Sequence, residues 1–345
     1  MKKLLTLAST TLLLAACSQG GGANEADQGA DSSDTSEPTT TETTETKEET
    51  SQADDTESTG KKEVVATTTQ VADLVTQIGG DHVTVTQLMG PGVDPHEYQP
   101  SSSDTQALNE AEIVAYNGFH LEQQFTSLFE SLDETNTHVL NMEGALDTSD
   151  VLASEEEEDD LEHDPHIWFS IENWKKAADY VAEQLSEADP DHADEYTANA
   201  ENYIQELDEL KAYAEGRIEE IPEQSRYLVT AHDAFQYFAE EFGFEVVGVQ
   251  GLNTNTEAGT GDISDVADLI VENNIKAVFV ESSVSSRNIE ALIEAVESRG
   301  HEISKGGELY SDALGEAADD ADTYIGMYKA NVDTIVDALN IKIKG

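Results

Sequence analysis

The feature that most restricts the fold is an alternation, from Glu63 onward, of short apolar runs rich in β-formers with helical segments. The predicted strands are residues 64–68, 83–88, 113–116, 227–230, 245–249 and 277–280, and predicted helices such as 70–78, 233–242, 266–273 and 288–298 lie between them. Strands that alternate with helices predict parallel sheets covered on both faces, which is the α/β class. The strands read as continuous apolar runs, as is typical of sheets buried on both sides.

One segment interrupts this alternation and predicts a single long helix. Its apolar side chains recur at spacings of three and four: Tyr203, Leu207, Leu210, Ala214, Ile218 and Ile221. Asp189 is a favourable N-cap and Pro190 a favourable first residue, whereas Pro222 ends the helix. A helix over 189–222 would be ~50 Å long, so we expect it to join two lobes as a rigid strut. The alternative is two shorter helices with a break between Asn199 and Asn202.

The first 16 residues carry the features of a secretory signal peptide, because a positively charged start (Met1, Lys2, Lys3) precedes a short apolar run. This run is shorter than the ~20 apolar residues that span a bilayer. The sequence Leu14-Ala15-Ala16-Cys17 resembles the lipobox of bacterial lipoproteins, which implies cleavage before Cys17 and a lipid on its sulfur. We therefore expect an extracytoplasmic chain, lipid-anchored to the cell membrane through Cys17. The alternative is an ordinary secretory signal in which this cysteine is incidental.

Composition divides the rest of the chain. Residues 17–60 are mostly Gly, Ser, Thr, Asp and Glu, which predicts a disordered acidic tether. The segment after residue 60 exceeds one typical domain, so we expect an N-terminal lobe over 61–188 and a C-terminal lobe over 223–345, on either side of the long helix. The net charge of -56 argues against nucleic-acid partners, which require a basic face. Because Cys17 is the only cysteine, the folded part can hold neither a disulfide nor a thiolate metal site.

Four side chains are candidate metal ligands. His96 and His166 each end an Asp-Pro-His sequence, His232 lies just past a predicted strand, and Asp312 lies in a loop before the last helix. Ligands of open α/β sheets bind outside the carboxyl ends of the strands, so these four side chains are expected to converge in the cleft between the lobes. Three imidazoles and one carboxylate suit tetrahedral zinc. Manganese prefers more oxygen, which a bidentate Asp312 would supply.

The motifs resemble those of the ZnuA/TroA-like zinc and manganese solute-binding proteins of ABC importers. The resemblance covers residues from about Glu63 to the C-terminus. It is carried by Asp94-Pro95-His96, Asp164-Pro165-His166-Ile167-Trp168, Thr230-Ala231-His232-Asp233-Ala234-Phe235 and Glu308-Leu309-Tyr310-Ser311-Asp312.

The resemblance implies two α/β lobes bridged by one long helix, with His96, His166, His232 and Asp312 as ligands. It also implies that the chain is not an enzyme and delivers its metal to the membrane permease subunits of an ABC importer. Manganese-selective members of the family carry glutamate at the third position, where this chain has His232, so zinc (Zn²⁺) is favoured over manganese (Mn²⁺) or use of both metals. We expect the protein to act as a monomer.

Other residues near the motifs keep alternative interpretations. The stretch 155–164 is acidic where many zinc-binding members have a histidine-rich loop, so it is either a weak metal-gathering loop with His163 or a solvated one. His120 either approaches the cleft or is a surface residue. Glu281 either steers Asp312 or His232 through water, or pairs with Arg287.

Four protein ligands would close the coordination sphere, which predicts capture of the metal without chemistry. At ordinary histidine pKa values, affinity should fall below about pH 6. A zinc hydrolase would need an open coordination position and a base, a role for which Glu281 is the candidate. A surface adhesin with a structural metal is the other alternative.

Overall fold

The computed structural model describes residues 60–132, 135–154 and 161–340. The predicted signal peptide over 1–16, Cys17, all of the tether except Gly60, and residues 155–160 of the acidic stretch lie outside the described residues. No helix in these described ranges combines the length and the apolar character needed to cross a membrane.

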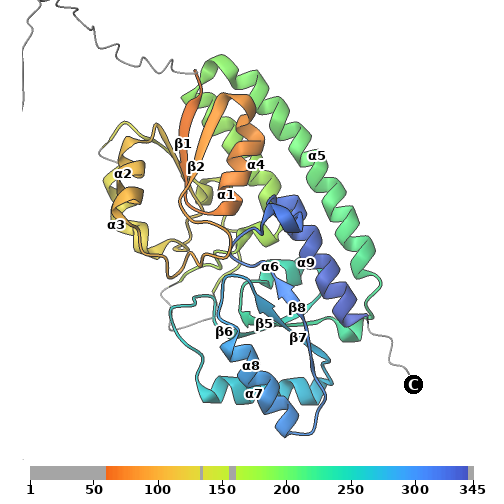
Figure 1. Cartoon of the computed structure of the whole chain (residues 1–345). Helices are drawn as coiled ribbons and strands as arrows, with labels where there is room; N and C mark the ends of the chain where they lie inside the picture. Colours follow the sequence, from red (N-terminus) through yellow and green to blue (C-terminus); the bar gives the residue numbers. More distant parts are fainter. Residues whose placement is uncertain (1–59, 133–134, 155–160, 341–345) are drawn as a thin grey trace, which may run out of the picture. The chain divides into compact units, whose positions relative to one another are not determined.

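The N-terminal lobe contains a parallel four-stranded sheet. Its strands are β1 (Lys62–Ala66), β2 (Val83–Gln87), β3 (Ile113–Tyr116) and β4 (His138–Asn141), in the order β2-β1-β3-β4. Helices α1 (Thr69–Gly79), α2 (Ser102–Glu110) and α3 (Thr126–Leu132) connect them, and α4 (Ile171–Ala188) follows (Figure 1). Because β1 leads to β2 on one side while β3 lies on the other, the crevice for a ligand is expected at the carboxyl ends of β1 and β3.

The C-terminal lobe contains two two-stranded parallel sheets. Strand β5 (Tyr227–His232) pairs with β6 (Glu245–Gln250), and β7 (Ala277–Glu281) pairs with β8 (Ser304–Leu309), in both cases in parallel. Strands β5 and β7 contact each other, which gives the spatial order β6-β5-β7-β8. The lobe also contains α6 (Gln236–Phe242), α7 (Thr260–Asn273), α8 (Arg287–Ser298) and α9 (Tyr324–Leu339). The predicted α/β class with two parallel-sheet lobes is therefore confirmed.

Local sequence sets where several helices begin and end. The Ser101 side chain accepts the amide of Asp104, whose carboxylate accepts the amide of Ser101, so a capping box starts α2. Thr323 caps α9 by accepting the Gly326 amide. Helix α6 ends at Phe242, and the next residue, Gly243, has a φ of 71°, a left-handed conformation that glycine adopts without steric cost.

A long helix is present but starts later than predicted. Helix α5 (Ala193–Ile218) has 26 residues and follows a separate 3-10 turn over Pro190–His192. Asp189 does not act as the N-cap: its carboxylate accepts the Tyr196 hydroxyl at 2.8 Å and lies 2.7 Å from His192 Nδ1. The helix is continuous through Asn199 and Asn202, so the alternative of two shorter helices is wrong. At 1.5 Å per residue its length is about 39 Å.

One continuous apolar core crosses from lobe to lobe. Helix α5 packs against α1 and α4 of the N-terminal lobe and against α9 (Figure 1). Buried aromatic side chains extend this core between the lobes, including a stacked pair of Trp174 and Tyr324 with ring centroids 5.0 Å apart. Hinge opening would expose this shared core to water, so it is disfavoured and small shifts are the expected motion.

Candidate metal centre

The four side chains singled out in the sequence meet in one buried cluster. One donor atom from each of His96, His166, His232 and Asp312 can be chosen so that all four atoms lie within 4.8 Å of one another. None of the four residues is more than 2% exposed. Within the described residues this is the only cluster of three or more potential metal ligands.

Each member lies at or beyond the carboxyl end of a parallel strand. His232 is the last residue of β5, whereas the sequence placed it just past the end of that strand. Asp312 comes three residues after β8, which ends at Leu309. His96 lies in the connection from β2 to α2, and His166 precedes the 3-10 turn Ile167–Phe169 that follows the connection from β4. Two members thus come from each lobe.

The distances between donor atoms match the edges of a small coordination polyhedron. His232 Nε2 lies 3.4 Å from His166 Nε2 and 3.3 Å from Asp312 Oδ1, and His166 Nε2 lies 3.5 Å from the same oxygen. In a tetrahedron with metal–ligand bonds of 2.0–2.1 Å, the edges are ~3.3 Å long. Buried and unpartnered, His96 Nε2 is available as the fourth donor.

Two carboxylates support the imidazoles from behind. Asp164 Oδ1 lies 2.7 Å from His166 Nδ1 and accepts the His166 amide at 2.9 Å. Glu281 Oε2 lies 2.6 Å from His232 Nδ1, and its Oε1 accepts the His232 amide at 2.9 Å. A carboxylate on Nδ1 fixes the ring so that Nε2 faces the metal position.

These contacts bear on the role of Glu281, which the sequence left open. Glu281 contacts His232 directly rather than through water, and among the described ion pairs none joins it to Arg287. The two Asp-Pro-His motifs differ from each other: Asp164 contacts both the backbone and the ring of His166. By contrast, Asp94 contacts the backbone of His96 and not its ring. One of its carboxylate oxygens accepts the His96 amide, and the other accepts the Thr254 hydroxyl across the cleft at 2.6 Å.

Charge and burial set the protonation of the cluster without metal. Burial lowers the pKa of His96 to about 3, against the attraction of Asp312. Burial also opposes charge on His166, but Asp164 and then Asp312 outweigh it and raise its pKa to about 9. His232 follows the same pattern, and Asp312 and Glu281 hold its pKa well above the usual value. Burial opposes charge on Asp312 as well, but the histidines, His232 first, hold the pKa of that carboxyl well below its usual range.

The cleft is covered by polar contacts between the lobes. The Asn255 amide donates to the His96 carbonyl at 3.4 Å, next to the bond from Thr254 to Asp94. Within the C-terminal lobe, Ser283 donates to Asp312 Oδ2 at 3.0 Å. Burial and the charge of Asp312 raise the pKa of Asp94 to about 6. A metal ion can therefore reach the donor atoms only when these contacts break.

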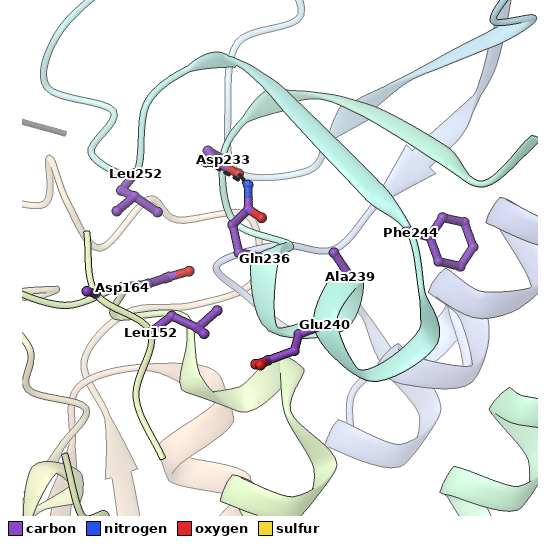
Figure 2. Close-up of a pocket in the computed structure, with 9 residues that line it drawn as sticks. Leu152, Asp164, Asp233, Gln236, Ala239, Glu240, Phe244 and Leu252 are labelled. Atoms are coloured by element: carbon purple, nitrogen blue, oxygen red, sulfur yellow. Dashed lines mark hydrogen bonds between the residues drawn. The ribbon is translucent and has the colours of Figure 1, made fainter. Parts of the chain in front are cut away.

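A pocket of about 710 Å³ opens beside the centre. Figure 2 shows Leu152 and Asp164 on one side of it and Asp233, Gln236 and Glu240 on the other, with the Gln236 amide hydrogen-bonded to Asp233. None of the four clustered side chains lines this pocket. Because Asp164 contacts the Nδ1 side of His166, the pocket adjoins the support of the centre and not its donor atoms.

Two other histidines considered from the sequence lie apart from the cluster. His120 is exposed, has a φ of 62° and lines a separate pocket with Glu143 and Phe129, so it does not approach the cleft. His163 is half-buried and packs edge-on against Phe119.

A run of buried polar residues, Thr67 to Gln70, lies at the end of β1 and was not predicted from the sequence. Four polar residues directly after a buried parallel strand were the signal that would have revealed them.

Known proteins share this fold and these motifs. Residues 64–338 match the family model ZnuA, described as "Zinc-uptake complex component A periplasmic". The manganese-binding lipoprotein MntA of Bacillus subtilis is 45% identical over 289 residues, covering 82% of this chain and 93% of that protein. The zinc-binding protein TroA of Treponema pallidum is 41% identical over 285 residues, covering 83% of this chain and 91% of TroA.

The structure is also similar to solved structures of such proteins. The periplasmic zinc-binding protein TroA from Treponema pallidum superposes with a TM-score of 0.77 at 41% identity, covering 81% of this chain and 99% of that one. A manganese-bound periplasmic metal-binding protein from Candidatus Liberibacter asiaticus gives 0.70 at 28% identity, covering 81% of this chain and 100% of that one. The sequence match, the shared fold and the clustered motif residues agree, and the chain belongs to the ZnuA family of metal solute-binding proteins.

Proposed function

We propose that this protein captures Zn²⁺ outside the cytoplasm and delivers it to the membrane permease subunits of an ABC importer. His96, His166, His232 and Asp312 are the proposed ligands. The observation that carries the proposal is the set of donor–donor distances of 3.3 to 3.5 Å among His166, His232 and Asp312, in a cluster shielded from water. Zinc takes nitrogen and oxygen donors at these spacings in four-coordinate sites.

The chemistry of the cluster favours binding over catalysis. Four protein donors fill the coordination sphere of zinc and leave no position for an activated water. Glu281, the candidate base of a hydrolase, has both oxygens within hydrogen-bonding distance of His232. That carboxylate therefore orients a ligand and is not placed to accept a proton from water. We therefore propose that the cluster holds the metal for transport.

Manganese is the alternative cargo, and a specific observation favours it. MntA of Bacillus subtilis, 45% identical to this chain, is named for manganese. Three imidazoles and one carboxylate provide fewer oxygen donors than manganese usually takes, which favours zinc at this centre. A bidentate Asp312 would reduce this difference.

Calorimetry separates these possibilities. The full chain, stripped of metal, is titrated with zinc and with manganese beside the variants His232→Glu and His120→Glu. The second variant makes the same chemical change at an exposed histidine outside the cluster. We expect one tight zinc site, weaker manganese binding, and a shift toward manganese only in His232→Glu.

Other results would decide against parts of the proposal. Equal affinity of the wild-type chain for both metals would replace zinc capture by capture of either metal. A wild-type chain that binds neither metal stoichiometrically would contradict the function. Unchanged zinc binding by His232→Glu would mean that zinc binds elsewhere in the molecule.

The membrane anchor is proposed for Cys17, in line with the lipoprotein name of MntA. Expression of the full chain with a labelled fatty acid should place the label on wild-type protein in the membrane fraction. Cys17→Ser should lose both the label and the membrane association. Label that persists in the variant would contradict anchoring at this residue.

A further inference from the structure

The loop that carries Asp312 belongs to the C-terminal lobe but is held by helix α1 of the N-terminal lobe. The amide of Leu314 donates to Thr69 Oγ1 at 2.8 Å, and Gln70 Nε2 donates to the Ser311 carbonyl at 3.4 Å. The indole nitrogen of Trp168 donates to the same carbonyl at 3.0 Å. Asp312 is thus flanked, at positions 311 and 314, by backbone groups that are hydrogen-bonded to the other lobe.

Thr69 and Gln70 act on this loop as one unit. The Thr69 hydroxyl accepts from Leu314 and donates to Gln70 Oε1 at 2.9 Å, which turns the Gln70 amide toward Ser311. Both residues are nearly inaccessible to water, with exposures of 4% and 1%. A buried backbone N–H that loses its acceptor stays unsatisfied, so the Thr69 hydroxyl is hard to replace.

Contacts from the C-terminal lobe reach the loop at different places. Asn331 of α9 holds Tyr310 through two hydrogen bonds, at 2.9 and 2.7 Å, and Ser283 donates to the Asp312 carboxylate. The backbone on both sides of Asp312 is therefore tied to α1 and Trp168, while the start of the loop is tied to α9. The loop that carries the Asp312 carboxylate is therefore hydrogen-bonded to both lobes.

We propose that Thr69 and Gln70 are positioning residues for Asp312, and that they set the affinity and the metal preference of the centre. This inference rests on the proposed function. In this arrangement the Asp312 loop is hydrogen-bonded to both lobes, whereas the amide and ring of His232 contact Glu281 of the C-terminal lobe.

The clamp formed by Thr69 and Gln70 favours zinc over manganese for a geometric reason. A carboxylate whose backbone is held at positions 311 and 314 offers one oxygen at the spacing of a tetrahedral site. A loosened carboxylate can turn to offer both oxygens, which suits a metal with a larger coordination number. Loss of the clamp should therefore weaken zinc more than manganese.

The test uses a matched set of variants in the full chain. Thr69→Val keeps the side-chain shape and removes the hydroxyl, whereas Thr69→Ser keeps the hydroxyl. Thr76→Val is the control, since it removes a hydroxyl that bonds within the same helix to the Ala72 carbonyl and does not touch the Asp312 loop. Zinc and manganese affinities are measured by competition with a chelator, and amide exchange near residues 311–314 is measured without metal.

We expect Thr69→Val to lose about tenfold in zinc affinity, with a smaller loss for manganese, and to exchange the Leu314 amide faster. Thr69→Ser and Thr76→Val should behave like the wild type in both measurements. Unchanged Leu314 exchange in Thr69→Val would overturn the clamp whether or not metal binds. Equal losses for the two metals would overturn its role in metal preference. A wild-type chain without metal binding would instead contradict the proposed function and leave the exchange result to decide the clamp.

Discussion

The protons held by the metal-free centre give the sharpest prediction. At pH 7.5 a histidine with a pKa of about 9 is roughly 97% protonated, so His166 carries a proton. His232, with a pKa well above its usual value, carries another, and His96, with a pKa of about 3, carries none. Zinc must displace both protons to bind, so about two should be released per metal. Three histidines with ordinary pKa values would together release only about 0.3 proton at this pH.

The same protons set the pH dependence of affinity. A raised pKa in the metal-free site means that the proton competes with zinc below that pKa, so affinity rises with pH up to about pH 9. With two competing protons, zinc affinity should increase roughly 100-fold per pH unit between pH 6 and 8. Histidines with ordinary pKa values would lose zinc affinity only below about pH 6. The buried carboxylates raise the pKa values of His166 and His232, so the loss of affinity begins at a higher pH.

Calorimetry in buffers of different ionisation enthalpy counts the protons directly. The slope of the observed enthalpy against the buffer enthalpy should give about two protons released at pH 7.5. Glu281→Gln removes one of the charges that raise the His232 pKa, so its count should fall below two. A count near zero for the wild type would refute the reasoning, because His166 and His232 would then be neutral in the metal-free centre.

Three more variants or conditions test the same contacts. Glu281→Gln should weaken zinc binding roughly 10- to 100-fold, because it removes the carboxylate that orients His232. The control variant Glu97→Gln, at an exposed position, should bind zinc like the wild type, and chelator competition measures both affinities. Leu207→Ala, at a fully buried position of α5, should lower the free energy of unfolding by about 2–5 kcal/mol without changing zinc stoichiometry, as denaturant titration would show. Free zinc at about 1,000 times its Kd should stabilise the wild type by about 4 kcal/mol, seen as a rise in Tm that His96→Ala abolishes.

The shared core explains why the centre is opened by small movements. Tyr324 and Tyr328 of α9 donate to the carbonyls of Trp168 and Phe169 in the N-terminal lobe at 2.7 and 3.0 Å. The Tyr324 amide also donates to Asp73 of α1 at 2.8 Å. Because α9 is bonded to both lobes through buried groups, rigid separation of the lobes would leave these groups unsatisfied.

Much of the fold could be predicted from the sequence, because strands are marked by short runs of neighbouring residues. Continuous apolar runs identified β1, β3, β5 and β7 to within two residues, since buried strands need apolar side chains on both faces. The more exposed β2 and β6 were found within the same margin. The edge strands β4 (His138–Asn141) and β8 (Ser304–Leu309) were missed. Both carry polar or glycine residues, and β8 contains Gly306 and Gly307, so backbone pairing with a neighbour defines them rather than their own side chains.

The candidate ligands could also be named from the sequence, because each sits in a short motif at the end of a strand. The structure alone decided what surrounds them. That Glu281 touches His232, that Asp94 reaches Thr254 while Asp164 does not, and that Thr69 holds the loop of Asp312 all depend on residues 49 to 245 positions apart. Such contacts leave no periodic or local trace in a sequence, since they exist only once the two lobes have packed around one core.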